Sequence, residues 1–139
     1  MKKLIPDVLT PEDRDDLLKL PAGNRIYTGP VIEKIKAVIE SEVGPVLWEP
    51  PTYMRLEKRV RSQPWHVDTG TNNHMMWCEY GCSILLEDGT DREVGCIEYR
   101  DGTIVRNYLS LAIHDSKEEH RVTDHKRERK TFLCFLKLK

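Results

Sequence analysis

The sequence lacks the features that direct a protein into a membrane or onto a polyanion. No apolar stretch approaches the ~18 residues that a membrane-spanning helix needs, so we expect no membrane partner. Neither sign of charge is in excess, because 22 basic residues stand against 23 acidic ones and the formal net charge is -1. No global field attracts the chain to a phosphate backbone, and nucleic acid is not expected as a partner.

Cysteines are few, and no secretion signal is visible. The short apolar pair Leu4-Ile5 is followed at once by Pro6 and Asp7, which leaves no hydrophobic region of a signal peptide. We therefore expect a cytoplasmic, reducing environment in which thiols stay reduced. Four cysteines are then expected as buried thiols rather than as a disulfide framework: Cys78, Cys82, Cys96 and Cys134.

The length of the chain, 139 residues, favours one domain over residues 1–139 with a single modest core. Hydrophobic residues make up 39% of the chain and are clustered, which argues against disorder. Helical patterns occur within residues 1–45, and short apolar or alternating runs follow within residues 46–139. We therefore expect a helical N-terminal layer followed by a β core.

Two helices are predicted in the N-terminal part. Thr10 followed by Pro11 is typical of a helix start, with a hydroxyl at the N-cap and proline at the first helical position, and this helix should end before Pro21. The second helix is expected to start at Pro30 and to end at Gly44. Its apolar residues form one stripe at helical spacing: Val31, Ile35, Val38 and Ile39.

The remainder of the chain has hydrophobic patterns typical of strands. Five runs are short and apolar or alternating: 53–57, 77–86, 94–99, 108–114 and 130–138. The dipeptides Asp88-Gly89 and Asp101-Gly102 are turn signals between them. Several strands at this spacing indicate a mainly β, antiparallel sandwich or barrel, and we expect the two helices to cover one sheet from outside.

Both faces of the last predicted strand are apolar. One face carries Phe132, Cys134, Leu136 and Leu138, and the other carries Leu133 and Phe135. A strand buried on both sides is typical of a sheet with a packed interior and a helix layer outside. Because side chains alternate along a strand, Arg129 shares the face of Leu133 and Phe135. If that face lines the barrel, Arg129 points inward.

A candidate metal site follows from three residues. His66 and Asp68 are two residues apart, so in extended backbone their side chains project from the same face within reach of one ion. A later histidine, His120, precedes the final strands. Two imidazoles and one carboxylate form a facial triad, which leaves coordination positions open and suits non-haem Fe(II). His114 is the alternative to His120 as the distal ligand, since it ends an apolar run.

The ordered set resembles the Fe(II)- and 2-oxoglutarate-dependent dioxygenases, particularly their prolyl-hydroxylase-like branch. The resemblance rests on His66-x-Asp68, on His120 followed two residues later by Val122, and on the basic Arg129 about ten positions further on. It spans roughly residues 53–138, a region that begins with two more candidate pocket residues, Tyr53 and Arg55.

What the resemblance implies is a double-stranded β-helix (jelly roll) that acts as a hydroxylase. His66, Asp68 and His120 would be the catalytic metal ligands for Fe(II), and Arg129 would bind the distal carboxylate of the cosubstrate 2-oxoglutarate. With O2 as the second cosubstrate, the enzyme would hydroxylate a protein side chain or a small molecule and release succinate and CO2. The substrate itself is left open.

Several alternatives remain open at this point. Arg127 or Lys130 could take the role of Arg129. Cys78 and Cys82, with His74 upstream, are a weaker candidate for a zinc site because no second pair lies at the usual distance. The last histidine, at position 125, lies in a charged run and is expected to be solvated. A β-helix domain that binds a metal or ligand without catalysis is the alternative function.

Overall fold

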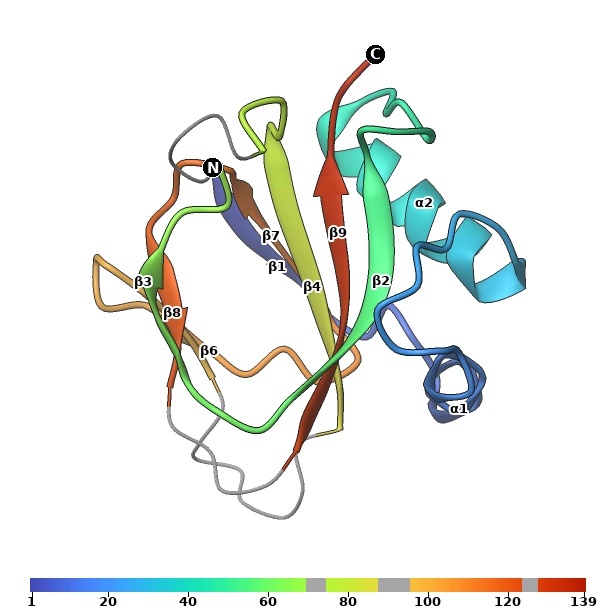
Figure 1. Cartoon of the computed structure of the whole chain (residues 1–139), viewed down its shortest axis with the longest axis horizontal. Coiled ribbons are helices and arrows are strands. Elements are labelled where there is room, and N and C mark those ends of the chain that lie inside the picture. The colour runs from blue at the N-terminus through green and yellow to red at the C-terminus, as the bar shows by residue number, and fades with distance from the viewer. Residues whose placement is uncertain (70–74, 88–95, 124–127) are drawn as a thin grey trace.

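The computed structural model describes residues 1–69, 75–87, 96–123 and 128–139 (Figure 1). Within these ranges the chain forms two helices and nine strands. Their order is β1 (Lys2–Ile5), α1 (Pro11–Leu18), α2 (Pro30–Val43), β2 (Tyr53–Arg59), β3 (Gln63–His66), β4 (Tyr80–Glu87), β5 (Ile97–Tyr99), β6 (Ile104–Val105), β7 (Leu111–Asp115), β8 (His120–Val122) and β9 (Arg129–Leu136). Neither helix reaches the length and hydrophobicity that a membrane span requires.

The strands form two antiparallel sheets that face each other. The larger sheet has the order β1-β7-β4-β9-β2, and the smaller one has the order β3-β8-β5-β6. From β2 onward the chain passes repeatedly from one sheet to the other, so strands distant in sequence become neighbours. This winding is that of a jelly roll, and the predicted double-stranded β-helix is confirmed.

The two helices begin where the sequence predicts. The hydroxyl of Thr10 accepts a hydrogen bond from the Asp13 amide at 3.1 Å, and the Asp13 carboxylate accepts one from the Thr10 amide at 3.0 Å. This capping box satisfies amide groups that the first turn of α1 leaves without helical partners. Helix α2 begins at Pro30 and is followed by Gly44, as expected.

Both helices cover the outer face of the larger sheet, as Figure 1 shows. The apolar stripe of α2 and residues of the sheet belong to one buried cluster. From α1 and α2 it contains Leu17, Val31, Ile32, Ile35 and Ile39, and from the sheet it includes Met54, Leu56, Ile84, Leu86, Ile113, Phe132, Cys134 and Leu136. Removing this apolar surface from water is the main force that holds the helix layer on the sheet.

Strand β9 has two different faces. Phe132, Cys134 and Leu136 are fully buried under the helices, as predicted. Leu133 and Phe135 lie on the other face, but they are only half-buried because this face lines a cavity instead of a packed interior. The strand ends at Leu136, two residues earlier than expected, and Leu138 forms only an isolated bridge with Val46.

Other differences concern short strands. The segment 1–45, predicted as a helical layer, also contributes β1, which pairs with β7 at the edge of the larger sheet. Two predicted runs begin later than expected, with β4 at Tyr80 and β7 at Leu111. The run 94–99 appears as β5 from Ile97, and its first two residues lie outside the described ranges.

One of the two turn signals can be examined in the structure. Asp101-Gly102 lies in the turn between β5 and β6, and Gly102 has a φ of 92°, a conformation that glycine adopts most readily. The other signal, Asp88-Gly89, lies outside the described residues. The sequence therefore located this hairpin correctly.

Candidate metal centre

Sheet register places the two predicted histidine ligands opposite each other. His66 ends β3 and His120 begins β8, and the two residues are direct partners in the antiparallel pairing of these strands. Their ring centroids are 4.3 Å apart. Two residues that are 54 positions apart in the sequence thus become neighbours through backbone pairing alone.

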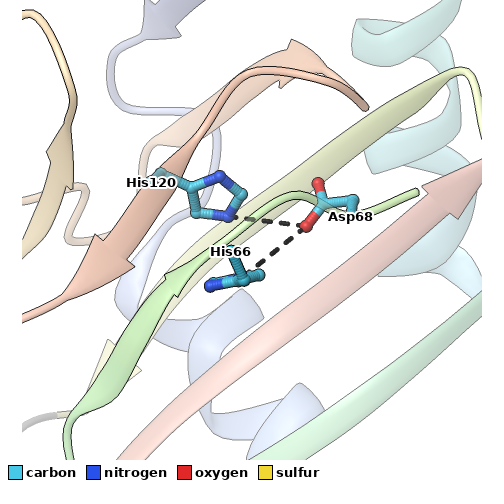
Figure 2. A group of neighbouring side chains, drawn as sticks. All are labelled: His66, Asp68 and His120. Carbon is cyan, nitrogen blue, oxygen red and sulfur yellow. Dashed lines mark ion pairs between the residues drawn. The ribbon is translucent and has the colours of Figure 1, made fainter. Parts of the chain in front are cut away.

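The carboxylate of Asp68 completes the group (Figure 2). Its Oδ1 atom lies 3.9 Å from Nε2 of His66 and 3.4 Å from Nε2 of His120. The ligand atoms of the three residues all lie within 4.8 Å of one another. The backbone amide of Asp68 donates to the Ser116 carbonyl at 2.9 Å, which holds the residue against the loop before β8. The structure therefore brings together the three predicted ligands.

The second nitrogen of each ligand histidine is bound to the backbone. Nδ1 of His66 lies 2.8 Å from the Pro64 carbonyl, and Nδ1 of His120 lies 2.8 Å from the Glu118 carbonyl. A carbonyl oxygen can only accept, so each Nδ1 carries a hydrogen and Nε2 is the ring atom left to serve as a ligand. Such partners are typical of metal-binding histidines. The donor set fits Fe(II) in a facial triad.

The protonation states also suit a cation. Burial lowers the pKa of His120 to about 4, and the neighbouring His114 contributes to the shift. His120 is therefore neutral at neutral pH and can act as a ligand. Burial raises the pKa of Asp68, but the hydrogen bond with His114 and the three nearby imidazoles outweigh it, so the pKa lies below its usual value. Asp68 is a carboxylate.

His114, the alternative distal ligand, contacts the other oxygen of the Asp68 carboxylate. Its Nε2 atom is 2.7 Å from Oδ2 of Asp68, the oxygen that does not face the other two histidines. Its Nδ1 atom is 3.0 Å from the hydroxyl of Tyr99. Among the described residues, the group of three convergent ligand atoms contains His120 and not His114. The geometry favours His120 as the third ligand and gives His114 a different position.

A glycine makes room for this arrangement. Gly81 in β4 pairs with His114 in β7, and a Cβ atom at position 81 would lie 1.8 Å from Oδ2 of Asp68 and 3.0 Å from Nε2 of His114. Any other residue would displace the carboxylate. Sequence analysis missed Gly81, although an isolated glycine within an apolar strand is a known signal of close approach.

The site opens into a cavity of about 450 Å³ between the two sheets. Its lining includes the three candidate ligands and, from β9, Arg129, Thr131, Leu133 and Phe135. Arg129 is only 5% exposed, so its guanidinium lies in surroundings largely removed from water. The predicted inward direction of Arg129 agrees with its place in this lining.

Of the two alternatives to Arg129, only Lys130 lies within the described residues. Lys130 alternates to the other side of β9, where its ammonium pairs with Glu87 at 2.7 Å. Lys130 is absent from the cavity lining, and it alternates to the side of β9 that carries Phe132 and Cys134. Arg127 lies outside the described residues, as do His74 and the histidine at position 125.

Aromatic residues and arginines line the cavity near Phe135. Tyr53 packs on Phe135 with ring centroids 5.1 Å apart and meets the edge of Trp77 at 6.2 Å. The guanidinium of Arg25 lies 4.5 Å from the centre of the Tyr53 ring. Tyr53 and Arg55 both line the cavity, as expected from the sequence.

All four cysteines are buried thiols, as predicted. Cys82 packs in the hydrophobic core, and the thiol of Cys78 donates to the Tyr80 carbonyl at 3.4 Å. Burial raises the pKa of Cys78 to about 12, which disfavours the thiolate that zinc requires. These surroundings do not support the zinc site that Cys78 and Cys82 suggested.

Comparison with known proteins identifies the architecture. A scan of protein-family models and a sequence search of curated proteins find no match. Solved structures do match. A Pseudomonas putida prolyl-4-hydroxylase aligns with a TM-score of 0.66 and 13% identity over 99% of this chain and 92% of its own. The fold is that of the prolyl 4-hydroxylases.

Two further structures have this prolyl 4-hydroxylase fold. A prolyl 4-hydroxylase from Phytophthora capsici aligns with a TM-score of 0.73 and 13% identity over 99% of this chain, which spans 58% of the length of that protein. An oxidoreductase of the 2OG-Fe(II) oxygenase family from Burkholderia pseudomallei aligns with a TM-score of 0.63 and 13% identity over 98% of this chain and 84% of its own. At these identities the likeness concerns the fold, and activity has to be argued from the residues of the site.

Proposed function

We propose that the protein is an Fe(II)- and 2-oxoglutarate-dependent dioxygenase that hydroxylates a protein side chain or a small molecule. One observation carries the proposal: the ligand atoms of His66, Asp68 and His120 converge within 4.8 Å in a cavity that Arg129 also lines. The first three residues supply a facial metal site with open positions, and the fourth supplies a buried partner for a carboxylate. The shared fold of prolyl 4-hydroxylases and a 2OG-Fe(II) oxygenase supports this assignment.

Fe(II) would be held by His66, Asp68 and His120. When bound, it would supply the activation of O2 needed to hydroxylate a C–H bond, and 2-oxoglutarate would be converted to succinate and CO2. The chain itself orients these ligands before a cation binds. The Pro64 and Glu118 carbonyls fix the orientation of the two imidazole rings. Because both rings are held in one tautomer, little rearrangement is needed when a cation enters.

Arg129 would bind the distal carboxylate of 2-oxoglutarate. Its planar guanidinium can donate two parallel hydrogen bonds to a carboxylate, a geometry that lysine cannot reproduce. The neighbouring cavity residue on the same face of β9 is Thr131, which is buried and carries a hydroxyl donor. Because Arg129 is buried, such charge-assisted bonds are stronger there than on the surface.

The substrate would lie near the aromatic part of the cavity. Tyr53 and Phe135 line the cavity and pack on each other, and Tyr53 also meets the edge of Trp77, so these rings can exclude water from one side of the metal site. Flat apolar rings suit the ring of a proline, and the similar structures include prolyl 4-hydroxylases. We therefore place peptidyl proline first among the substrates to be tested, with small molecules second.

A cytoplasmic location forms part of the proposal. The four cysteines are buried thiols and form no disulfide with one another, a state that a reducing compartment preserves. Fe(II) is also maintained more readily where reductants are available.

The activity is tested by following succinate formation. Protein supplied with Fe(II), ascorbate, O2 and 2-oxoglutarate should convert 2-oxoglutarate slowly to succinate, and proline-containing peptides should accelerate the conversion if they are substrates. Asp68→Ala is the matched control, since it removes one ligand and should reduce the rate to background. If the wild-type protein binds Fe(II) and 2-oxoglutarate but forms no succinate with or without peptides, the protein is a non-catalytic binding domain instead.

A further inference from the structure

A chain of two hydrogen bonds ends on the Asp68 carboxylate of the candidate metal centre. The hydroxyl of Tyr99 is 3.0 Å from Nδ1 of His114, and Nε2 of His114 is 2.7 Å from Oδ2 of Asp68. Tyr99 is 2% exposed and His114 is 4% exposed, so water does not compete for these bonds. Neither residue belongs to the three candidate metal ligands.

The chemistry of the groups determines the direction of the chain. The carboxylate of Asp68 can only accept, so Nε2 of His114 donates its hydrogen to Oδ2. In the tautomer with its hydrogen on Nε2, the ring of His114 accepts at Nδ1, and the hydroxyl of Tyr99 donates to it. Each donor has an acceptor, and the imidazole ring is fixed at both nitrogens.

The two oxygens of Asp68 thus have separate partners. Oδ1 faces Nε2 of His66 and Nε2 of His120, whereas Oδ2 is engaged by His114. We propose that His114, held by Tyr99, is a positioning residue that restricts Asp68 to one-oxygen coordination of the metal. A carboxylate that bound through both oxygens would occupy one of the positions that the cosubstrates need. This inference rests on the proposed function, because it presupposes a metal at the site.

The hydrogen bond between His114 and Asp68 joins the larger sheet to the segment that follows the smaller sheet's strand β3. His114 belongs to β7 of the larger sheet, while the ligand histidines belong to β3 and β8 of the smaller one. Gly81, the partner of His114 in β4, leaves the space into which the Asp68 carboxylate fits. The hydrogen bond from His114 therefore fixes the position of the metal site relative to the opposite sheet.

Mn(II) is a suitable probe because it reports both affinity and hydration. His114→Leu removes the donor but keeps a buried side chain, whereas His114→Gln keeps an N–H group that can reach the carboxylate. We expect His114→Leu to weaken Mn(II) binding about 10- to 100-fold, the usual effect of losing a partner of a metal ligand. We also expect a lower water-proton relaxivity per bound Mn(II), because the freed Oδ2 displaces a coordinated water. His114→Gln should restore part of both values.

Tyr99→Phe is the milder variant. It keeps the ring and removes only the hydroxyl that holds His114, so it should fold even if His114→Leu does not, and it should lower affinity and relaxivity in the same direction by less. A Tyr27→Phe variant, which alters a tyrosine bound to the Thr52 carbonyl instead of the site, should match the wild type.

Three results would overturn the inference in different ways. If the folded His114 and Tyr99 variants bind Mn(II) with wild-type affinity and relaxivity, His114 does not position Asp68, and the proposed function is unaffected. If His114→Leu abolishes binding as completely as His66→Ala, His114 is itself a ligand. If the wild-type protein binds neither Mn(II) nor Fe(II), the metal centre and the proposed function fail together.

Discussion

Three histidines surround Asp68, and their hydrogen bonds give them different roles. His66 and His120 donate from Nδ1 to backbone carbonyls and direct Nε2 toward Oδ1 of Asp68. His114 instead uses Nε2 to hold the other carboxylate oxygen. The three histidines therefore differ in which oxygen of Asp68 they face and in the partner of the other ring nitrogen, which is a backbone carbonyl for His66 and His120 and the Tyr99 hydroxyl for His114.

Gly81 offers a sharp test at the residue scale. In Gly81→Ala the new methyl group would overlap Oδ2 of Asp68, which His114 holds in place. The carboxylate must move, so we expect Fe(II) affinity to fall by about 10-fold or more, the range for disturbed metal ligands. Titration of Fe(II) under anaerobic conditions measures the change.

Ser83→Ala is the matched control for this change. Ser83 lies two residues further along β4, on the same face, and its contacts are with Asn107 rather than with Asp68. It should therefore bind Fe(II) like the wild type. Equal affinity in the Gly81→Ala protein would show that the carboxylate is not confined as the structure describes.

The residues of the site differed in how far the sequence could reveal them. His66 and Asp68 were predictable because alternation along a strand places them on one face, and Arg129 because it shares a face with Leu133 and Phe135. The roles of His114 and Gly81 were not, since both depend on the distance between two sheets. An isolated glycine in an apolar strand signals that some group approaches closely, but no local pattern in the sequence identifies that group.

At the scale of elements, strand β9 connects the helix layer with the cavity. Leu136 is fully buried under the helices, whereas Phe135 on the opposite face is half-buried at the cavity. We expect Leu136→Ala to lower the free energy of unfolding by about 2 to 5 kcal/mol because it leaves a void in a packed core. Phe135→Ala should cost less, because water can fill the space that it leaves. Urea denaturation measures the free energy of unfolding of both variants. A larger loss for Phe135→Ala than for Leu136→Ala would contradict this prediction.

Long elements were predictable and short ones were not. The helices have local start signals, Thr10-Pro11 and Gly29-Pro30, which act through capping and fixed backbone angles. Strands β6 and β8 have two and three residues, too few to show a period of two. Strand β1 forms through pairing with β7, more than 100 residues away in the sequence, and its own residues carry no apolar alternation.

At the scale of the whole molecule, the jelly roll places the main hydrophobic core and the candidate site on opposite faces of the larger sheet. The helices and the outer face of the larger sheet form the main hydrophobic core, while the inner faces of both sheets enclose the cavity. The candidate ligands come from the smaller sheet and its adjoining loop, and Arg129 comes from the larger one. The packing of the two sheets on each other therefore brings the candidate metal ligands and Arg129 into one cavity.

The central claim is that this cavity binds Fe(II) and 2-oxoglutarate together. Anaerobic titration tests it most directly, because chelation of Fe(II) by 2-oxoglutarate produces a visible charge-transfer absorption band. The wild-type protein should develop the band and saturate. Arg129→Ala should bind Fe(II) normally but lose about 2 to 5 kcal/mol of 2-oxoglutarate binding, the range for removing one partner of a buried charge pair, and Arg129→Lys should fall between the two. No band in the wild-type protein, or an identical 2-oxoglutarate dependence in Arg129→Ala, would contradict the account.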